Sequence, residues 1–260
     1  MTPSDQEIVQ VERDGAVALV RLNRPEKHNA LDLAMRRALA KAVEALVAED
    51  GIRAIVIAGS DTVFAAGADL SLLAEKGAQE VANLALPSYW APLVHCPKPL
   101  FAAVNGVALG AGCELALLCD VIVADRGAAF GQPELGVGIM PGAGGTQRLI
   151  RAVGKSVAGA MLYAGERLSG ERAHALGLVA VLTEQGMAVD AAMALARRAA
   201  HMPARAVAAT KRTLALGADL PLEAALALEN REFLLLFDTW DKSEGMTAFL
   251  EKRRPEFRGC

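Results

Sequence analysis

The apolar segment 100–124, LFAAVNGVALGAGCELALLCDVIVA, constrains the fold more than any other part of this sequence. It is long enough to cross a bilayer as one helix. However, Asn105, Glu114 and Asp120 lie inside it, and three glycines divide it into short pieces. Polar residues and glycines in these positions favour a protein core over a membrane span. We therefore predict a buried strand, a turn, a helix and another buried strand (100–104, 112–119 and 120–124).

The same strand, helix and strand order occurs earlier in the chain. Residues 15–22 are rich in Val, Leu and Ala and predict a strand, and residues 54–58, AIVIA, predict a buried one. Between them, apolar side chains recur at helical spacing over residues 35–46, with Asp32 as the N-cap and Gly51 just beyond the end. The repeated order predicts a layered α/β core with parallel strands.

The last quarter of the chain has a different pattern. Helical apolar spacing separated by Pro or Gly predicts four helices, at 187–200, 203–216, 221–237 and 244–252. The 221–237 helix is apolar on more than one face, so we expect it to be buried against the core or against another subunit. If the helix is buried against another subunit, the chain forms a homo-oligomer.

Composition narrows the possible partners and compartments. With 260 residues, 53% of them hydrophobic, the chain is able to bury a substantial core. A formal net charge of −3 disfavours nucleic acid as a partner. The four cysteines show no metal-like spacing, and MTPSDQEIVQ lacks a secretory signal. We expect a reduced, cytoplasmic protein that does not bind membranes.

Several common motifs are incomplete. GKS at 154–156 resembles a phosphate loop, but Leu149 occupies the position where that loop needs glycine, so we predict a helix start there. The glycine clusters do not complete GxGxxG, which argues against a nicotinamide cofactor, and neither GxSxG nor HExxH is present. The histidines occur in unrelated contexts and are expected to be surface or packing residues (His28, His95, His174 and His201).

Two glutamates stand in apolar, glycine-rich surroundings: Glu114 in GAGCELALLCD and Glu134 in FGQPELGVG. Desolvation there keeps one carboxyl group protonated near neutral pH while a neighbour ionises, which suits general acid/base catalysis. The structural alternative is that Glu114 caps a helix N-terminus and Glu134 pairs with an arginine. The small-residue runs 64–70 and 108–114 leave backbone N–H groups unhindered, as in an oxyanion hole, although each is also compatible with a simple tight turn.

Five motifs, taken together and in order, resemble the enoyl-CoA hydratase/isomerase, or crotonase, family: NRPEKHNALD, FAAGADL, NGVALGAGCELALLCD, FGQPELGVGIMPGAGGTQRLIRAVGKS and EGMTAFLEKRRPEF. The resemblance covers nearly the whole chain. It implies an α/β fold of the ClpP/crotonase type, a spiral of ββα units in residues 1–195. It also implies a helical C-terminal region, residues 196–260, that assembles homotrimers or hexamers.

The resemblance also implies roles for individual residues. The N–H groups of Ala68 and Ala111 would form the oxyanion hole, and Glu114 and Glu134 would hold the catalytic water. Ala111 stands where many members have glycine, and its N–H serves equally if its backbone angles are ordinary. The implied coenzyme A contacts are Ala66, Asp69, Leu70, Ser71, Phe249 and Lys252. The last two would reach a neighbouring subunit's ligand, and Ser71 replaces a lysine that some members have.

The activity implied is syn hydration of a trans-2-enoyl-CoA to a 3-hydroxyacyl-CoA, without a metal or redox cofactor, since coenzyme A is part of the substrate. GAGCELALLCD and GIMPGAGGTQRLIR particularly resemble the members that hydrate 2,3-dehydroadipyl-CoA in phenylacetate degradation. Residues 72–93 are expected to surround the acyl chain. A carboxylate at the end of that chain needs a polar partner, for which Lys76, Tyr89 and His95 are candidates, because they lie in the stretch expected to line that end. The alternatives are a Δ3,Δ2-enoyl-CoA isomerase, an acyl-CoA hydrolase, and a non-catalytic oligomeric scaffold or RNA-binding relative.

Overall fold

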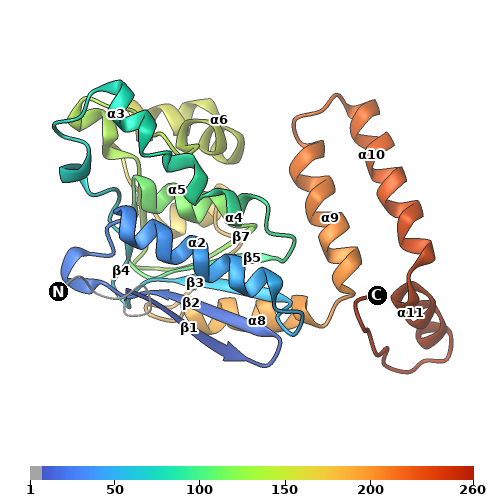
Figure 1. Cartoon of the computed structure of the whole chain (residues 1–260). Helices are drawn as coiled ribbons and strands as arrows, with labels where there is room; N and C mark the ends of the chain where they lie inside the picture. Colours follow the sequence, from blue (N-terminus) through green and yellow to red (C-terminus); the bar gives the residue numbers. More distant parts are fainter. Residues whose placement is uncertain (1–7) are drawn as a thin grey trace.

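A computed structural model describes residues 8–260 (Figure 1). Residues 1–7 lie outside the described residues. They include the start of the predicted 1–195 region and part of the N-terminal segment predicted to lack a secretory signal. The main sheet has the strand order β1-β2-β3-β5-β7-β10. Only β1 is antiparallel to its neighbour, so the prediction of parallel pairing is confirmed. The strands are β1 (Val9–Asp14), β2 (Val17–Leu22), β3 (Ala54–Ala58), β5 (Leu100–Val104), β7 (Val121–Asp125) and β10 (Val181–Thr183).

A second, smaller sheet makes the fold a spiral. Its order is β4-β6-β8-β9, with bounds Val63–Ala65, Val107–Leu109, Ala129–Gly131 and Leu168–Ser169. In the chain, β4, β6 and β8 each follow a strand of the main sheet and precede helical structure, so successive turns add one strand to each sheet. This confirms the ββα spiral that the family resemblance implied. The periodicity alone missed these strands because three residues are too few to show an alternation.

Both faces of the main sheet are buried. Ile55 and Ile57 on β3 belong to the same hydrophobic cluster as the apolar face of α2 (Leu33–Ala48). Val56 and Ala58, which point the other way, pack with α8 (Ala188–Ala200). Strands buried on both sides need no polar alternation, which explains the continuous apolar run AIVIA.

The remaining helices of the core confirm most of the predicted elements. They are α3 (Ala78–Asn83), α4 (Ala91–Val94), α5 (Ala111–Leu118), α6 (Gly145–Tyr163) and α7 (Gly170–Ala175). The segment 100–124 forms β5, β6, α5 and β7, and among residues 8–260 no helix is long and apolar enough to span a membrane. Asp32 caps α2 by accepting a hydrogen bond from Met35 N at 2.9 Å. Gly154 interrupts α6 with a φ of 78°, so a second helical segment begins at the GKS sequence.

The C-terminal helices stand beside the core (Figure 1). They are α9 (Ala204–Gly217), α10 (Leu222–Leu235), a short 3-10 turn η5 (Leu236–Asp238) and α11 (Trp240–Leu250). The all-helical prediction is confirmed, although α11 begins before residue 244 because Thr239 caps it. Leu222 on α10 is 73% exposed, and Phe233 and Leu234 are also exposed. Burial of the 221–237 helix against its own core is therefore wrong, and burial against another subunit stays a prediction.

Candidate active site

The loop at residues 23–32 holds the loop that follows β4. Asn29 is fully buried and its amide nitrogen donates to the carbonyl oxygens of Val63 and Phe64, both at 3.1 Å. Its amide oxygen accepts a hydrogen bond from Arg24 N at 2.8 Å. Next to it, Leu31 N donates to the carbonyl of Gly67 at 2.8 Å. The motif NRPEKHNALD therefore acts as a scaffold that fixes the position of the small-residue loop.

Two residues whose backbone N–H groups are unpaired within residues 8–260, Ala68 and Ala111, lie at one cavity. Both residues line it, and neither N–H donates a hydrogen bond to another residue of the described chain. Ala111 begins α5 with ordinary backbone angles, so its methyl group imposes no strain. The preceding Gly110 has a φ of 50°, and a methyl carbon there would lie 2.7 Å from Glu134 Oε1. Glycine is thus required at position 110 but not at position 111.

Glu114 is buried in the first turn of α5, and its carboxylate also serves the next helix. Its Oε1 accepts hydrogen bonds from Ala143 N at 2.7 Å and Gly145 N at 2.8 Å. These donors lie at the N-terminus of α6, where unpaired N–H groups favour a carboxylate. The capping alternative is therefore confirmed, with α6 as the helix that is capped. Because the amides occupy Oε1, Oε2 is the oxygen left for a ligand in the cavity.

Glu134 lies in the turn η4 (Pro133–Val137) and is partly buried. Burial raises its pKa, and the charge of Glu114 raises it further, while a backbone hydrogen bond opposes both. With its nitrogen turned towards Glu134, the Gln132 amide donates to both carboxylate oxygens, at 3.1 and 3.2 Å. No arginine forms an ion pair with Glu134 within residues 8–260, so the arginine alternative is wrong.

Glu114 and Glu134 line the same cavity as Ala68 and Ala111, with a volume of about 660 Å³. Seven residues of the predicted 72–93 segment also line it, and most are apolar: Leu73, Lys76, Val81, Ala82, Leu86, Pro87 and Trp90. Two acids, two unpaired amides and an apolar wall in one cavity suit a polarised carbonyl group attached to a hydrocarbon chain.

The polar candidates for this cavity were only partly right. Lys76 lines it, whereas Tyr89 and His95 are not among its lining residues. Sequence reasoning also missed Arg36, which lines the cavity from α2. A charged residue on a helix is expected to face solvent. The ring of Trp90, which covers the Arg36 guanidinium, is distant in sequence, so the pattern around Arg36 gave no sign of its burial.

The other predicted ligand contacts fall into two groups. Ala66, Asp69, Leu70 and Ser71 flank Ala68 in one loop. There Asp69 Oδ1 accepts hydrogen bonds from Ser71 N at 3.1 Å and Ser71 Oγ at 2.6 Å. Phe249, which is 82% exposed, and Lys252 belong to the region of α11, at the far end of the molecule from α3 (Figure 1). Within one chain these two residues are not brought to the cavity, and the other four flank Ala68 without being among the residues that line it.

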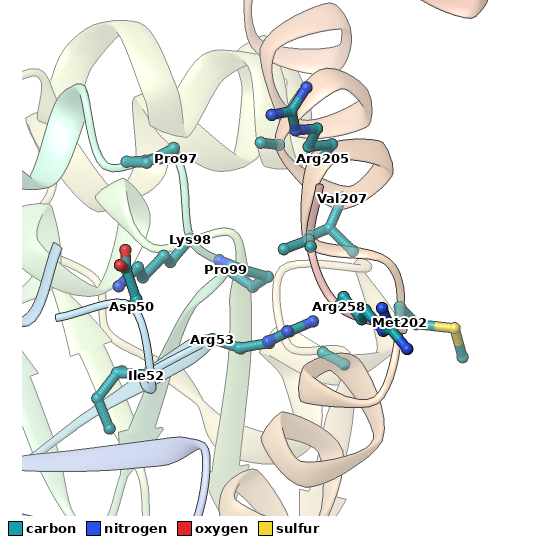
Figure 2. A pocket seen from close by; sticks show the side chains of 14 residues that line it. Asp50, Ile52, Arg53, Pro97, Lys98, Pro99, Met202, Arg205, Val207 and Arg258 are labelled. Carbon is teal, nitrogen blue, oxygen red and sulfur yellow. The ribbon is translucent and has the colours of Figure 1, made fainter. Parts of the chain in front are cut away.

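A second cavity, of about 420 Å³, lies where β3 and β5 begin (Figure 2). Figure 2 shows Arg53, Arg205 and Arg258 around it, from the core, α9 and the C-terminal tail. Lys98 also lines it, but its Nζ already donates to the carbonyls of Leu46 and Glu49, at 2.6 and 2.7 Å. Asp50 is the one acid among its lining residues. Without a second carboxyl group this cavity offers no acid/base pair.

Comparisons with known proteins agree with this geometry. Residues 12–260 match the family model of enoyl-CoA hydratase/isomerase. The 2,3-dehydroadipyl-CoA hydratase of Escherichia coli (strain K12) is 47% identical over 249 residues, which cover 96% of this chain and 98% of that protein. A probable mitochondrial enoyl-CoA hydratase of Dictyostelium discoideum is 40% identical, covering 94% and 88%. A crystal structure of enoyl-CoA hydratase subunit I from Geobacillus kaustophilus HTA426 has a TM-score of 0.94 at 40% identity, covering 97% of this chain and 98% of that chain.

Proposed function

This chain belongs to the enoyl-CoA hydratase/isomerase family and is an enoyl-CoA hydratase, and we propose that it hydrates 2,3-dehydroadipyl-CoA. The observation that carries the reaction type is the meeting of Glu114 and Glu134 with two unpaired backbone amides in one cavity. The support for the substrate is the 47% identity to a relative named for it.

In the proposed reaction, the amides of Ala68 and Ala111 hold the thioester oxygen. Negative charge develops on this oxygen when water attacks Cβ, and two preorganised donors stabilise it. Because Glu114 Oε1 is held by the α6 amides, Oε2 accepts a proton from the attacking water. Glu134 delivers a proton to Cα. Its raised pKa favours the protonated form that this step needs.

The substrate proposal is tested by measuring kcat/KM side by side for 2,3-dehydroadipyl-CoA, crotonyl-CoA and a long-chain enoyl-CoA. We expect the dicarboxylic substrate to have the highest value. A tenfold preference for an uncharged chain, about 1.4 kcal/mol of transition-state binding, would reject the dicarboxylate and leave the hydratase assignment intact. Isomerisation without hydration on all three would reject the proposed roles of the two glutamates.

We further propose that residues 196–260 assemble trimers or hexamers. The exposed apolar side chains of α10 and α11 support this, since such patches mark protein interfaces. In an assembly, Phe249 and Lys252 would contact coenzyme A bound to a neighbouring chain. Within this region, residues 196–200 end α8, which packs on the sheet, so the exposed apolar surface that supports assembly lies after Ala200.

A further inference from the structure

Arg36 is a charged residue inside the wall of the catalytic cavity. It lies on α2, is only 5% exposed, and lines the same cavity as Glu114 and Glu134. A buried guanidinium is costly unless charged or polar groups compensate it. Its partners therefore decide whether Arg36 is a satisfied structural residue or one that still has donors for a ligand.

The contacts of Arg36 use only part of its hydrogen-bonding capacity. Nε donates to the carbonyl of Leu31 at 2.8 Å, and the guanidinium carbon lies 4.8 Å from the centre of the Trp90 ring. Its two terminal nitrogens donate no hydrogen bond to another residue of the described chain. Neither nitrogen is completely buried, so both keep some accessible surface. Because Arg36 is buried and lines the cavity, the cavity is the place where these nitrogens can meet a ligand.

The nearest acids do not neutralise this guanidinium directly. Asp32 pairs with Arg24 at 2.8 Å and caps α2, and Glu114 places Oε1 on the α6 amides. Both acids act on Arg36 only as nearby charges that oppose the effect of burial, which lowers the Arg36 pKa. No carboxylate of residues 8–260 forms an ion pair with it. A planar cation with two free donor groups thus borders an otherwise mostly apolar acyl cavity.

We propose that Arg36 is the specificity-determining residue that binds the carboxylate at the far end of a dicarboxylic enoyl-CoA. This inference rests on the proposed hydratase function and assigns a residue to its substrate class. The terminal nitrogens of a guanidinium match a carboxylate in a two-point contact, and Trp90 holds the plane in place. An uncharged chain end would leave these donors unpaired, which disfavours that substrate.

Lys76 is the other cation of the cavity wall, and it is exposed. Its flexible ammonium group is hydrated, so it contributes less to selection between chain ends than a desolvated guanidinium does. Replacing Arg36 by an uncharged residue should therefore reduce the preference for a charged chain end more than replacing Lys76 does.

The experiment compares 2,3-dehydroadipyl-CoA with 2-hexenoyl-CoA, which has the same number of carbons and no carboxylate. We expect Arg36→Met to lower kcat/KM for the dicarboxylic substrate about 10- to 100-fold relative to 2-hexenoyl-CoA, because a charge-assisted contact is lost. Arg36→Lys should restore part of the preference, since it keeps the charge but not the two-point contact. Arg37→Met is the matched control, because Arg37 is the exposed neighbour on the same helix.

A binding measurement covers the case in which Arg36→Met also impairs the chemistry. Calorimetry with adipyl-CoA and hexanoyl-CoA, which lack the reactive double bond, should show weaker binding of adipyl-CoA alone. An equal fall for both ligands and both substrates would overturn the inference, because Arg36 would then act through Glu114 or through folding.

Failure of the inference and failure of the proposed function give different results. A wild-type preference for the dicarboxylic substrate that survives in Arg36→Met overturns the Arg36 assignment alone. A wild-type enzyme without that preference, in turnover and in binding, overturns both the substrate and its recognition by Arg36. Absence of hydration with any substrate rejects the reaction, while the adipyl-CoA measurement still tests Arg36.

Discussion

The spiral core and the C-terminal helices are both rich in apolar residues, yet they use them differently. In the core, large side chains such as Ile55, Phe64 and Leu115 are completely buried. On α10 and α11, Leu222 and Phe249 are largely exposed. The core therefore buries most of its large hydrophobic residues within one chain, while the C-terminal helices leave an apolar surface that a partner chain would cover. Substitutions in the core should therefore affect catalysis within one chain, whereas substitutions on α10 and α11 should affect assembly.

The largest expected effect belongs to the core alone. Glu114→Gln and Glu134→Gln should each lower hydration by at least the ~10²-fold typical of losing one acid/base group. Binding of the coenzyme A ester should change little, since the Ala68 and Ala111 amides remain. Steady-state kinetics combined with a binding assay for a saturated acyl-CoA measures both.

Glu166→Gln is the matched control, because Glu166 lies on the surface of the spiral region and is exposed. Near wild-type turnover in either cavity variant, on every enoyl-CoA assayed, would remove that residue from the proposed mechanism.

The next effect tests whether the space beside Glu134 requires glycine at position 110. Gly110→Ala should lower kcat at least tenfold, because alanine is strained at a φ of 50° and its methyl carbon would approach Glu134 Oε1. Gly136→Ala is the control, since no atom lies within 4 Å of the position its methyl group would take. Equal kinetics for the two variants would contradict the requirement for glycine at position 110.

The sequence predicted most of the core because long periodic segments determine it. Residues 100–124 combine apolar runs with glycines, which already implied strands and a helix, and both glutamates stood out by their apolar context. The Glu114 contacts could not be predicted, because Ala143 and Gly145 are distant in sequence and meet it only in the folded chain. Arg36 was missed for the same reason, since burial of a charged residue depends on tertiary neighbours.

For the C-terminal helices, the expected effect is on assembly. We predict a homo-oligomer of three or six chains, and Leu226→Glu on α10 should shift it to smaller species by placing charge on the exposed apolar surface. Light scattering measures the mass at micromolar concentration. Tyr163→Glu is the control, because Tyr163 is an even more exposed apolar residue (82%, against 51% for Leu226) but lies on α6, outside the C-terminal helices.

Assembly should also affect kinetics if Phe249 and Lys252 reach a neighbour's coenzyme A. We then expect Leu226→Glu to raise KM several-fold with little change in kcat, because the acid/base pair stays within one chain. A monodisperse wild-type monomer would contradict the assembly and make the shared coenzyme A contact untenable.

The smallest effect is the pH dependence of stability at Glu134. Because its pKa is raised in the folded chain, its contribution to stability is fully present below the unfolded value, near 4.5, and is lost as pH rises through the folded value. Glutamine stays neutral, so the Tm of Glu134→Gln minus that of the wild type should increase with pH across this window. Thermal unfolding at several pH values measures the difference, and Glu166→Gln should give a flat line. The slope should be smaller in a Glu114→Gln background, since one of the two causes of the shift is removed while burial remains. A slope of the opposite sign would mean that the hydrogen bonds to the Glu134 carboxylate outweigh its desolvation.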